Sequence, residues 1–243
     1  MNVMCVIPAR FASTRLPGKP LKLIAGVPMI CRVYDRAKQA WTVDKTLVAT
    51  DDERIASAVT DYGGEAVLTD KKHPTGTDRL AEVAIKFPDY ELIINVQGDE
   101  PLIEPELINQ LALAFQDATL QMATVATPIG AEEQSNPNNV KVVMDKNDFA
   151  LYFSRSLVPY PRKEGVVTVY KHIGIYAYKR DFLLNFAKMP PTPLEQTESL
   201  EQLRVLENGY KIKVIKSNYK FIGVDTEEDL RLVNEIYGRQ GHE

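Results

Sequence analysis

Positively charged residues directly after the first apolar segment give the chain its clearest capacity for chemistry. Residues 8–20 read PARFASTRLPGKP and carry Arg10, Arg15 and Lys19. Small residues such as Ala9 leave backbone N–H groups accessible, and Gly18 permits a tight bend beside Lys19. Amide and cationic donors together suit a triphosphate, whose anionic oxygens accept many hydrogen bonds. The segment is therefore a candidate nucleotide-binding loop.

Two common phosphate-binding motifs are absent from this loop. The pattern G-x-x-x-x-G-K-[ST] would need glycine at position 13 and Ser or Thr at position 20, where the chain has Ser13 and Pro20. The dinucleotide pattern G-x-G-x-x-G is also missing, which disfavours a dehydrogenase. A solvated basic loop without a ligand is the alternative, but its position after a strand favours a function.

Acidic residues at two distant places could complete such a site. Asp99 and Glu100 follow the apolar segment Leu92 to Val96, and Asp225 follows Phe221 to Val224. Mg²⁺ is usually held by one or two carboxylates together with phosphate oxygens and water, so Asp99 is a candidate metal ligand. For Asp225, the residues alone favour an N-cap of the following helix over a metal ligand.

Polar residues elsewhere could bind a base or a sugar, although most have a simpler structural explanation. Thr75, Gly76 and Thr77 precede a predicted helix, and capping by Thr77 would account for them. Gln97 lies beside Asp99 and can both donate and accept hydrogen bonds.

A further polar group lies in the C-terminal half. Arg155 follows a predicted strand, and a guanidinium suits bidentate contact with a carboxylate. His172 and Tyr176 share one face of a predicted strand, where a packed pair in the core is the simpler explanation. Glu201 and Gln202 belong to a predicted helix, on which acidic residues usually form a solvated face.

The elements that must position these residues alternate between strand and helix in the first half of the chain. Strands are expected at Val3–Ile7, Lys45–Thr50, Glu65–Leu68, Leu92–Val96 and Ala123–Thr127, and helices at Met29–Ala40, Asp52–Tyr62, Asp78–Phe87 and Glu104–Phe115. This alternation predicts an α/β fold with a mainly parallel sheet flanked by helices. Ligands of such sheets bind beyond the carboxyl ends of the strands, which points to the loops after Ile7, Thr50 and Val96.

The second half is less regular, and the whole chain, 1–243, is expected to form one domain. Strands are expected at Val140–Met144, Ala150–Phe153, Val166–Ala177 and Lys211–Ile215, helices at Leu194–Leu206 and Glu227–Tyr237, and an exposed arm at 159–165. Asp51 and Asp52 end a strand, and we expect them to cap the next helix rather than bind a nucleotide.

The composition excludes several classes of protein. The 243 residues carry a formal net charge of −4, which disfavours a nucleic-acid partner. No apolar run approaches the roughly 18 residues of a membrane-spanning helix, and the N-terminus does not resemble a signal peptide. The two cysteines, Cys5 and Cys31, fit apolar patterns and are expected to be buried, reduced thiols. A cytoplasmic location without membrane contact is the resulting expectation.

The motifs together resemble a known family. The pattern P-A-R-x-x-S-x-R-x-P-G-K-P resembles the signature of sugar-acid cytidylyltransferases, and most closely the 3-deoxy-manno-octulosonate (Kdo) cytidylyltransferase family. Further matches follow in family order over almost the whole chain: NVQGDEP at 95–101, YFSR at 152–155, HIGIY at 172–176, LEQLR at 200–204 and GVDT at 223–226.

The resemblance implies a fold, a reaction and a set of residues. The fold is that of nucleotide-diphospho-sugar transferases, a Rossmann-like sheet with an elaborated C-terminal half. The reaction joins Kdo to CMP from CTP, with release of pyrophosphate, in lipopolysaccharide biosynthesis by a Mg²⁺-dependent homodimer. It implies that Asp99 and Asp225 share the metal and act in catalysis with Arg10 and Lys19. Nucleotide contacts are implied for Ala9, Arg10, Arg15, Lys19, Thr75, Gly76, Thr77 and Gln97, and sugar contacts for Gln97, Arg155, His172, Tyr176, Glu201 and Gln202.

Two other functions stay open at this point. A cytidylyltransferase for a related sugar acid, such as 8-amino-Kdo or a sialic acid, would use the same residue types. A non-catalytic nucleotide-binding module on the same fold would bind CTP but release no pyrophosphate. Fold alone does not decide between them. In every case Lys19 must face Asp99 and Asp225, since the chemistry needs the cationic loop and the two acids at one place.

Overall fold

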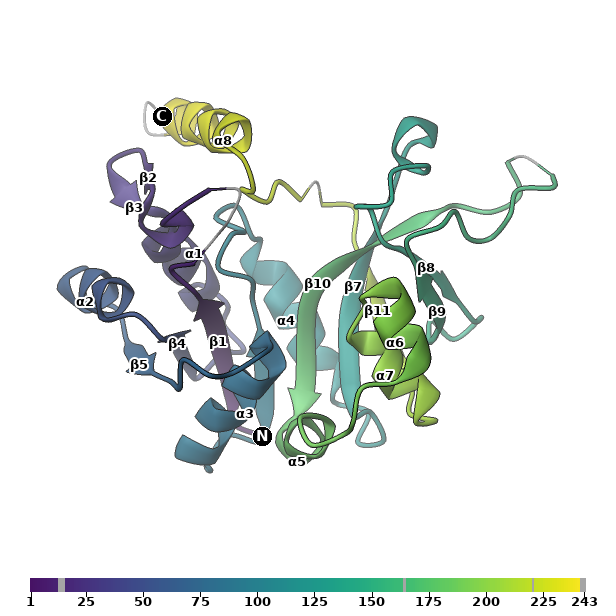
Figure 1. Cartoon of the computed structure of the whole chain (residues 1–243), viewed down its shortest axis with the longest axis horizontal. Helices are drawn as coiled ribbons and strands as arrows, with labels where there is room; N and C mark the ends of the chain where they lie inside the picture. The colour runs from purple at the N-terminus through teal and green to yellow at the C-terminus, as the bar shows by residue number, and fades with distance from the viewer. Residues whose placement is uncertain (13–15, 164, 220, 241–243) are drawn as a thin grey trace.

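A mixed β-sheet runs through the middle of the molecule and carries helices on both faces (Figure 1). The computed structural model describes residues 1–12, 16–163, 165–219 and 221–240. The main strand order is β11-β7-β10-β6-β1-β4-β5, and β8 and β9 extend the sheet beside β10. The strands are β1 (Val3–Ala9), β4 (Lys45–Thr50), β5 (Ala66–Leu68), β6 (Leu92–Asn95), β7 (Met122–Pro128), β8 (Lys141–Met144), β9 (Ala150–Ser154), β10 (Tyr170–Lys179) and β11 (Ile212–Lys216).

Alternating side chains of the central strands build a separate core on each face of the sheet. On β1, Cys5 and Ile7 pack into one core, while Met4 and Val6 pack into the other. The first core is completed by α1 (Met29–Lys38), α2 (Glu53–Asp61) and α4 (Pro105–Ala114), and the second by α3 (Gly76–Lys86), α5 (Arg180–Phe186) and α7 (Gln202–Glu207). Burial on both faces explains why these strands are apolar throughout rather than alternating.

The expected α/β fold is confirmed, but one central strand runs against the others. Strands β1, β4, β5 and β6 pair in parallel, as do β7 and β11. Strand β10 lies between β6 and β7 and is antiparallel to both. The expected strand at Val166–Ala177 is shifted, since β10 covers Tyr170–Lys179. Its pairing with β7 changes register between Ile173 and Tyr176, so the backbone bulges at Gly174.

The helix expected at Leu194–Leu206 is instead two short helices, α6 (Pro193–Glu198) and α7. Ser199 between them adopts the left-handed conformation, with φ of 51°, which ends α6. Glu195 on α6 and Arg204 on α7 form a buried ion pair across the break, with Nη2–Oε1 of 2.5 Å and Nε–Oε2 of 2.7 Å. The apolar spacing that predicted one helix reflects burial of both short helices against the same core.

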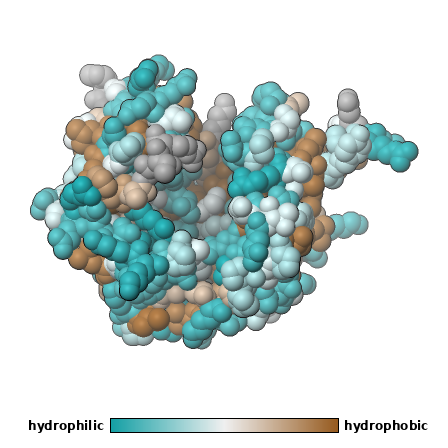
Figure 2. Space-filling model, in the orientation of Figure 1, coloured by the Kyte–Doolittle hydropathy of each residue, from teal (hydrophilic) through white to brown (hydrophobic). Residues whose placement is uncertain are grey.

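The C-terminal helix α8 (Glu227–Gln240) packs far from the strand that precedes it. In Figure 1 the chain leaves β11, crosses above the sheet and ends beside α1 and the hairpin of β2 (Leu23–Ile24) and β3 (Val27–Pro28). Asn234 fastens α8 there, since its side chain accepts from Ala25 N at 2.9 Å and donates to Leu23 O at 3.2 Å. The chain between β11 and α8 connects the two sides of the molecule in this view. Figure 2 shows a hollow in the surface between these two sides.

Several smaller expectations are also confirmed. Cys5 and Cys31 are free, buried thiols, and burial raises the pKa of Cys5 to about 12. In the arm at 159–165, Tyr160 and the other described residues are exposed. Across the described ranges, none of the helices combines the length and apolarity needed to span a bilayer. Helix α5 and the β2–β3 hairpin were not predicted.

Replacing Arg204 with alanine is expected to lower the free energy of unfolding by about 3–5 kcal/mol, because Glu195 would keep a buried charge without its partner. Urea denaturation would measure the loss. The side chains of Arg204 and Glu195 are only 8% and 11% exposed. The matched control is Lys216→Ala, which breaks the far more exposed Lys216–Asp148 pair and should cost less than about 1 kcal/mol. Equal losses in both variants would contradict this role of the buried pair.

Candidate active site

A pocket of about 380 Å³ opens at the carboxyl ends of β1 and β6, where ligands of such sheets are expected. It draws its walls from three distant parts of the sequence. The lining residues are Pro8, Ala9, Arg10, Ala12, Lys19, Pro20, Gln97, Gly98, Asp99 and Asp225. The pocket therefore collects the cationic loop and both candidate acids, as the sequence predicted.

The amino group of Lys19 lies between the two acids. Its Nζ is 2.6 Å from Oδ2 of Asp99 and 3.0 Å from Oδ1 of Asp225. Burial acts to lower the pKa of Lys19, but its charge and hydrogen-bond interactions with Asp99, and then with Asp225, outweigh burial and raise that pKa above its usual value. The expected convergence of Lys19, Asp99 and Asp225 is thus confirmed, whereas their catalytic and metal-binding roles stay predictions.

Two glycines let the backbone bring these groups together. Gly18 has φ of 65° and precedes the short 3-10 helix Lys19–Leu21, so the turn that presents Lys19 requires a conformation that glycine adopts freely. Gly98 lies against the end of β1, and a Cβ there would be 2.9 Å from Pro8 O. A side chain at position 98 would therefore push the Asp99 loop away from the cationic loop.

Asp225 does not cap α8, so the interpretation favoured by the residues alone is wrong. Thr226 and Asp229 form the reciprocal cap instead: Thr226 Oγ1 accepts from Asp229 N at 3.2 Å, and Asp229 Oδ2 accepts from Thr226 N at 2.9 Å. The Asp225 carboxylate thereby reaches Lys19. Val224 N also donates to Asp99 O at 2.9 Å, which joins the two acidic segments through their backbones.

A third carboxyl group, that of Glu100, is close enough to this pair to feel its charge, although it lines a separate pocket. Glu100 is half-buried, and burial followed by the nearby charge of Asp99 raises its pKa to about 8. At neutral pH most of the Glu100 side chain is consequently protonated. The negative charge at the pocket thus comes mainly from Asp99 and Asp225, which balances the adjacent cations.

The donor set suits a divalent ion of the magnesium type. Two carboxylates from separate segments already converge on one positive group, the Lys19 ammonium. Among the described residues, no cluster of three or more His, Cys, Asp or Glu side chains could hold a metal. A site with only two carboxylates fits Mg²⁺ bound partly by substrate phosphates better than an all-protein metal cage.

The predictions for Arg10, Ala9 and Arg15 of the cationic loop differ in how far the structure tests them. Arg10 lines the pocket, and its Nη2 donates to the backbone carbonyl of His73 at 2.9 Å. Ala9 ends β1 and also lines the pocket. Arg15 lies outside the described residues, so its predicted phosphate contact is untested.

The segment expected to contact the nucleotide base begins helix α3. Thr75, not Thr77, is the N-cap, because its hydroxyl accepts from Asp78 N at 3.2 Å and the Asp78 carboxylate accepts from Thr75 N at 3.2 Å. Gly76 is the first helical residue. Thr77 is therefore free of capping, and its Oγ1 donates to Glu201 Oε2 at 2.6 Å.

This contact connects α3 to the residues predicted to bind the sugar. Glu201 precedes α7, and its burial raises the carboxyl pKa, while hydrogen bonds from Thr77 and Thr75 act in the opposite direction. Gln202 begins α7 and is buried. The nucleotide and sugar predictions thus meet at one place, which the separate motifs did not reveal.

His172 and Tyr176 lie on one face of β10, as predicted, with ring centroids 5.4 Å apart. Burial lowers the pKa of His172 to about 3, so the ring is neutral near pH 7. The bulge between them turns the carbonyl of Gly174 toward Gln97, whose Nε2 donates to it at 2.7 Å. Gln97 is therefore the link between the Asp99 loop and the His172–Tyr176 face.

Arg155 has a structural role that the sequence did not suggest. Its guanidinium donates to the carbonyls of Glu198 (2.7 Å), Pro137 (3.1 Å) and Ser199 (3.3 Å), while its backbone N–H donates to the Glu198 carboxylate. These bonds secure the break between α6 and α7. Arg155 does not line the 380 Å³ pocket, and its contact with a sugar carboxylate stays a prediction.

Sequence reasoning missed two buried polar residues beside the site. Asn95 ends β6 opposite Tyr176, and its Oδ1 is buried without a hydrogen-bond partner among the described residues. Arg79 is fully buried and pairs with Asp51 at 2.9 Å, which explains Asp51, whereas Asp52 caps α2 as expected by accepting from Arg54 N. Asn95 begins the NVQGDEP match at 95–101, whereas the only signal for Arg79 was a charged residue within an apolar helical pattern.

Known proteins with similar sequences carry one consistent description. The family model for cytidylyltransferases matches residues 4–212. A 3-deoxy-manno-octulosonate cytidylyltransferase of Fusobacterium nucleatum is 57% identical over 235 residues, covering 96% of each chain. One from Syntrophotalea carbinolica is 51% identical over 241 residues, covering 95% of this chain and 96% of the relative.

Solved structures agree with the sequence matches. A CMP:2-keto-3-deoxy-manno-octonic acid synthetase complexed with CTP superposes with a TM-score of 0.95 and 44% identity, covering 99% of this chain and 100% of the other. A putative glucose-1-phosphate thymidylyltransferase of Bacillus anthracis shares the fold alone, with a TM-score of 0.67 and 15% identity over 96% of this chain and 94% of its own. These matches show that the chain belongs to the 3-deoxy-manno-octulosonate cytidylyltransferase branch of the cytidylyltransferase family.

Proposed function

We propose that this protein transfers CMP from CTP to the anomeric hydroxyl of Kdo, with release of pyrophosphate and with Mg²⁺ as cofactor. The observation that carries the proposal is the placement of Lys19 between Asp99 and Asp225 in a pocket that also contains Arg10. The 57% identical relative of the same description supports the choice of substrates.

The reaction substitutes one oxygen for another at the α-phosphorus. The sugar oxygen forms the new P–O bond, the bond to pyrophosphate breaks, and the hydroxyl proton leaves to solvent or to an acceptor. Such transfers depend mainly on positioning and on stabilising charge. Lys19 and Arg10 supply positive charge for the triphosphate and the departing pyrophosphate, and Gln97 lies between them and the sugar side of the pocket.

Asp99 and Asp225 would hold Mg²⁺, because they present two carboxylates to one point from segments joined by the Val224–Asp99 backbone bond. When bound, the ion neutralises phosphate charge and orients the α-phosphate. Glu100 contributes little negative charge at neutral pH, which keeps the pocket from becoming too acidic for a triphosphate.

The sugar is proposed to bind between β10 and α7. Neutral His172, Tyr176 and the half-buried Glu201 offer donors and acceptors for hydroxyl groups. Gln97 ties this face to the Asp99 loop through Gly174. The homodimer, the cytoplasmic location and the role in lipopolysaccharide biosynthesis are further proposals that rest on family membership.

Asp99→Asn is expected to lower kcat by a factor of roughly 10²–10³ or more, because the amide removes charge where the metal and phosphates meet. Steady-state assays of pyrophosphate release would measure kcat, and circular dichroism would confirm folding. Asp181→Asn is the matched control, since the side chain of Asp181 is 95% exposed on α5. Near-normal turnover of Asp99→Asn would remove this residue from the mechanism.

With Kdo as acceptor, kcat/KM for CTP is expected to exceed that for UTP by roughly 10²-fold or more, because a site built to hydrogen-bond one base leaves polar groups unpaired with another.

Removal of Mg²⁺ with a chelator should abolish turnover, and added Mg²⁺ should restore it.

The same assay separates the competing functions. Faster pyrophosphate release with 8-amino-Kdo or a sialic acid would reassign the sugar while keeping the reaction class. Binding of CTP without pyrophosphate release from any acidic sugar would identify a non-catalytic module instead.

A further inference from the structure

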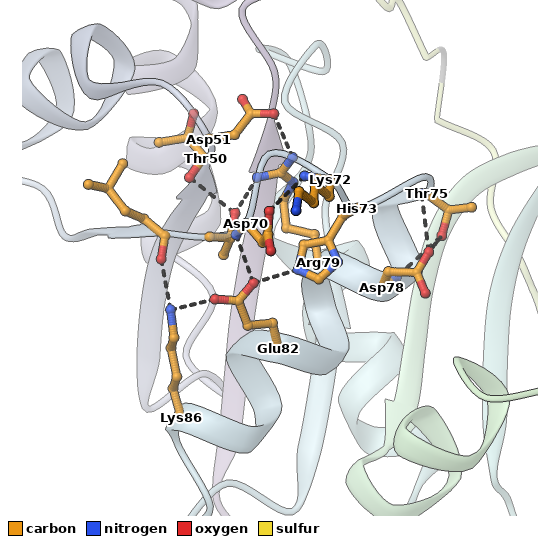
Figure 3. A network of polar contacts seen from close by, with 12 residues as sticks. Thr50, Asp51, Asp70, Lys72, His73, Thr75, Asp78, Arg79, Glu82 and Lys86 are labelled. Atoms are coloured by element: carbon orange, nitrogen blue, oxygen red, sulfur yellow. Dashed lines mark hydrogen bonds and ion pairs between the residues drawn. The ribbon is translucent and has the colours of Figure 1, made fainter.

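The loop at 69–75, between β5 and α3, is fastened to α3 through one carboxylate. Figure 3 shows Glu82 pointing from α3 into this loop. Its Oε2 accepts from Asp70 N at 2.9 Å and lies 2.5 Å from His73 Nε2, while Oε1 pairs with Lys86 Nζ at 2.6 Å. Although burial acts to raise the pKa of Glu82, hydrogen bonds from Lys86, Asp70 and His73 prevail and lower it to about 2. Ionised Glu82 can only accept, so His73 Nε2 carries the proton in this contact.

His73 connects this network to the nucleotide pocket. Its ring contacts Glu82, and its backbone carbonyl accepts from Arg10 Nη2 at 2.9 Å. Pro74 follows, and the residue before a proline is sterically confined to extended conformations. Pro74 thus limits the backbone conformations of His73, and the contact of its ring with Glu82 holds in place the residue whose carbonyl accepts from Arg10.

Both ends of the loop are held as well. Arg79, fully buried, donates to the Thr69 hydroxyl and pairs with Asp51 at 2.9 Å. At the other end Thr75 and Asp78 form the capping box of α3 (Figure 3). The loop is thus a fixed platform, and its His73 carbonyl is a defined anchor for the Arg10 guanidinium.

We propose that Glu82 and His73 are positioning residues that orient Arg10 for the triphosphate, without touching the substrate themselves. The inference rests on the proposed function of Arg10 as a phosphate ligand. The bond to His73 uses one of the five N–H donors of the guanidinium. Fixing that donor reduces the conformational freedom that Arg10 would otherwise lose when CTP binds, which improves affinity through preorganisation.

Calorimetric measurement of CTP affinity in the presence of Mg²⁺ tests this inference. We expect Glu82→Gln and His73→Ala to raise the Kd for CTP by about 3- to 10-fold, which is the scale of one ordered side chain. His73→Gln, whose amide can still donate to Glu82, should restore most of the affinity. The KM for Kdo should stay unchanged in all three variants.

A double-mutant cycle separates positioning from mere stabilisation of the loop. In an Arg10→Ala background, Glu82→Gln should change the Kd for CTP by less than twofold, because it acts through Arg10. Glu65→Gln is the matched control, since it breaks the Lys45–Glu65 pair at the adjacent sheet edge and should leave CTP affinity unchanged. Thermal denaturation of each variant reports on folding.

Three outcomes would overturn the inference: unchanged affinity in Glu82→Gln, equal losses with and without Arg10, or no recovery in His73→Gln. If His73→Ala fails to fold, the Glu82→Gln cycle still decides. The proposed function is judged separately, by pyrophosphate release from the wild-type protein with CTP and Kdo. Binding of CTP without turnover would refute that function while the affinity cycle still tests the positioning of Arg10.

Discussion

The structure depends on holding two carboxylates at one point, and the Lys19 ammonium makes that possible. Asp99 and Asp225 come from distant segments, and like charges at close range repel each other strongly when partly removed from water. Lys19 Nζ lies within 3.0 Å of both and offsets this repulsion. Protonation of Glu100 removes a third charge from the same region. The two carboxylates and the two cations of the pocket, Lys19 and Arg10, thus have a formal net charge close to zero before an anionic ligand and its metal bind.

The fold supplies this arrangement through the order of its strands. Strands β1 and β6 are parallel neighbours, so the loops after them emerge at one edge of the sheet, and Gly98 lets them approach closely. Asp225 reaches the same edge only because the chain crosses from β11 to α8 above the sheet (Figure 1). Packing of α8 against the β2–β3 hairpin therefore has a direct consequence for the site.

Local patterns in the sequence were sufficient for the parallel strands of the first half and for the place of Lys19 and Arg10 in the pocket. Strand β4 at Lys45–Thr50 was predicted with its bounds, because buried parallel strands have short apolar runs between helices. Some failures are local, such as the cap of α3, which is Thr75 rather than Thr77. Others involve non-local effects. The antiparallel insertion of β10 is decided by pairing with β6 and β7, and the break at Ser199 by the Arg155 and Arg204 contacts. The cap of α8 is the local Thr226–Asp229 pair, whereas the contact that the Asp225 carboxylate makes depends on Lys19, which is remote in sequence.

Glu201 shows how the site differs from a core built only for stability. Its side chain is half-buried, and the partial burial raises the pKa of the carboxyl group. Its closest partner is the Thr77 hydroxyl, while the nearby Arg204 is committed to Glu195. A carboxylate partly removed from water and without a matched cation costs stability. The contact instead joins the start of α3 to α7 at the boundary between the nucleotide and sugar regions. The sugar-binding role proposed for Glu201 would account for a polar group at this place, which packing alone does not require.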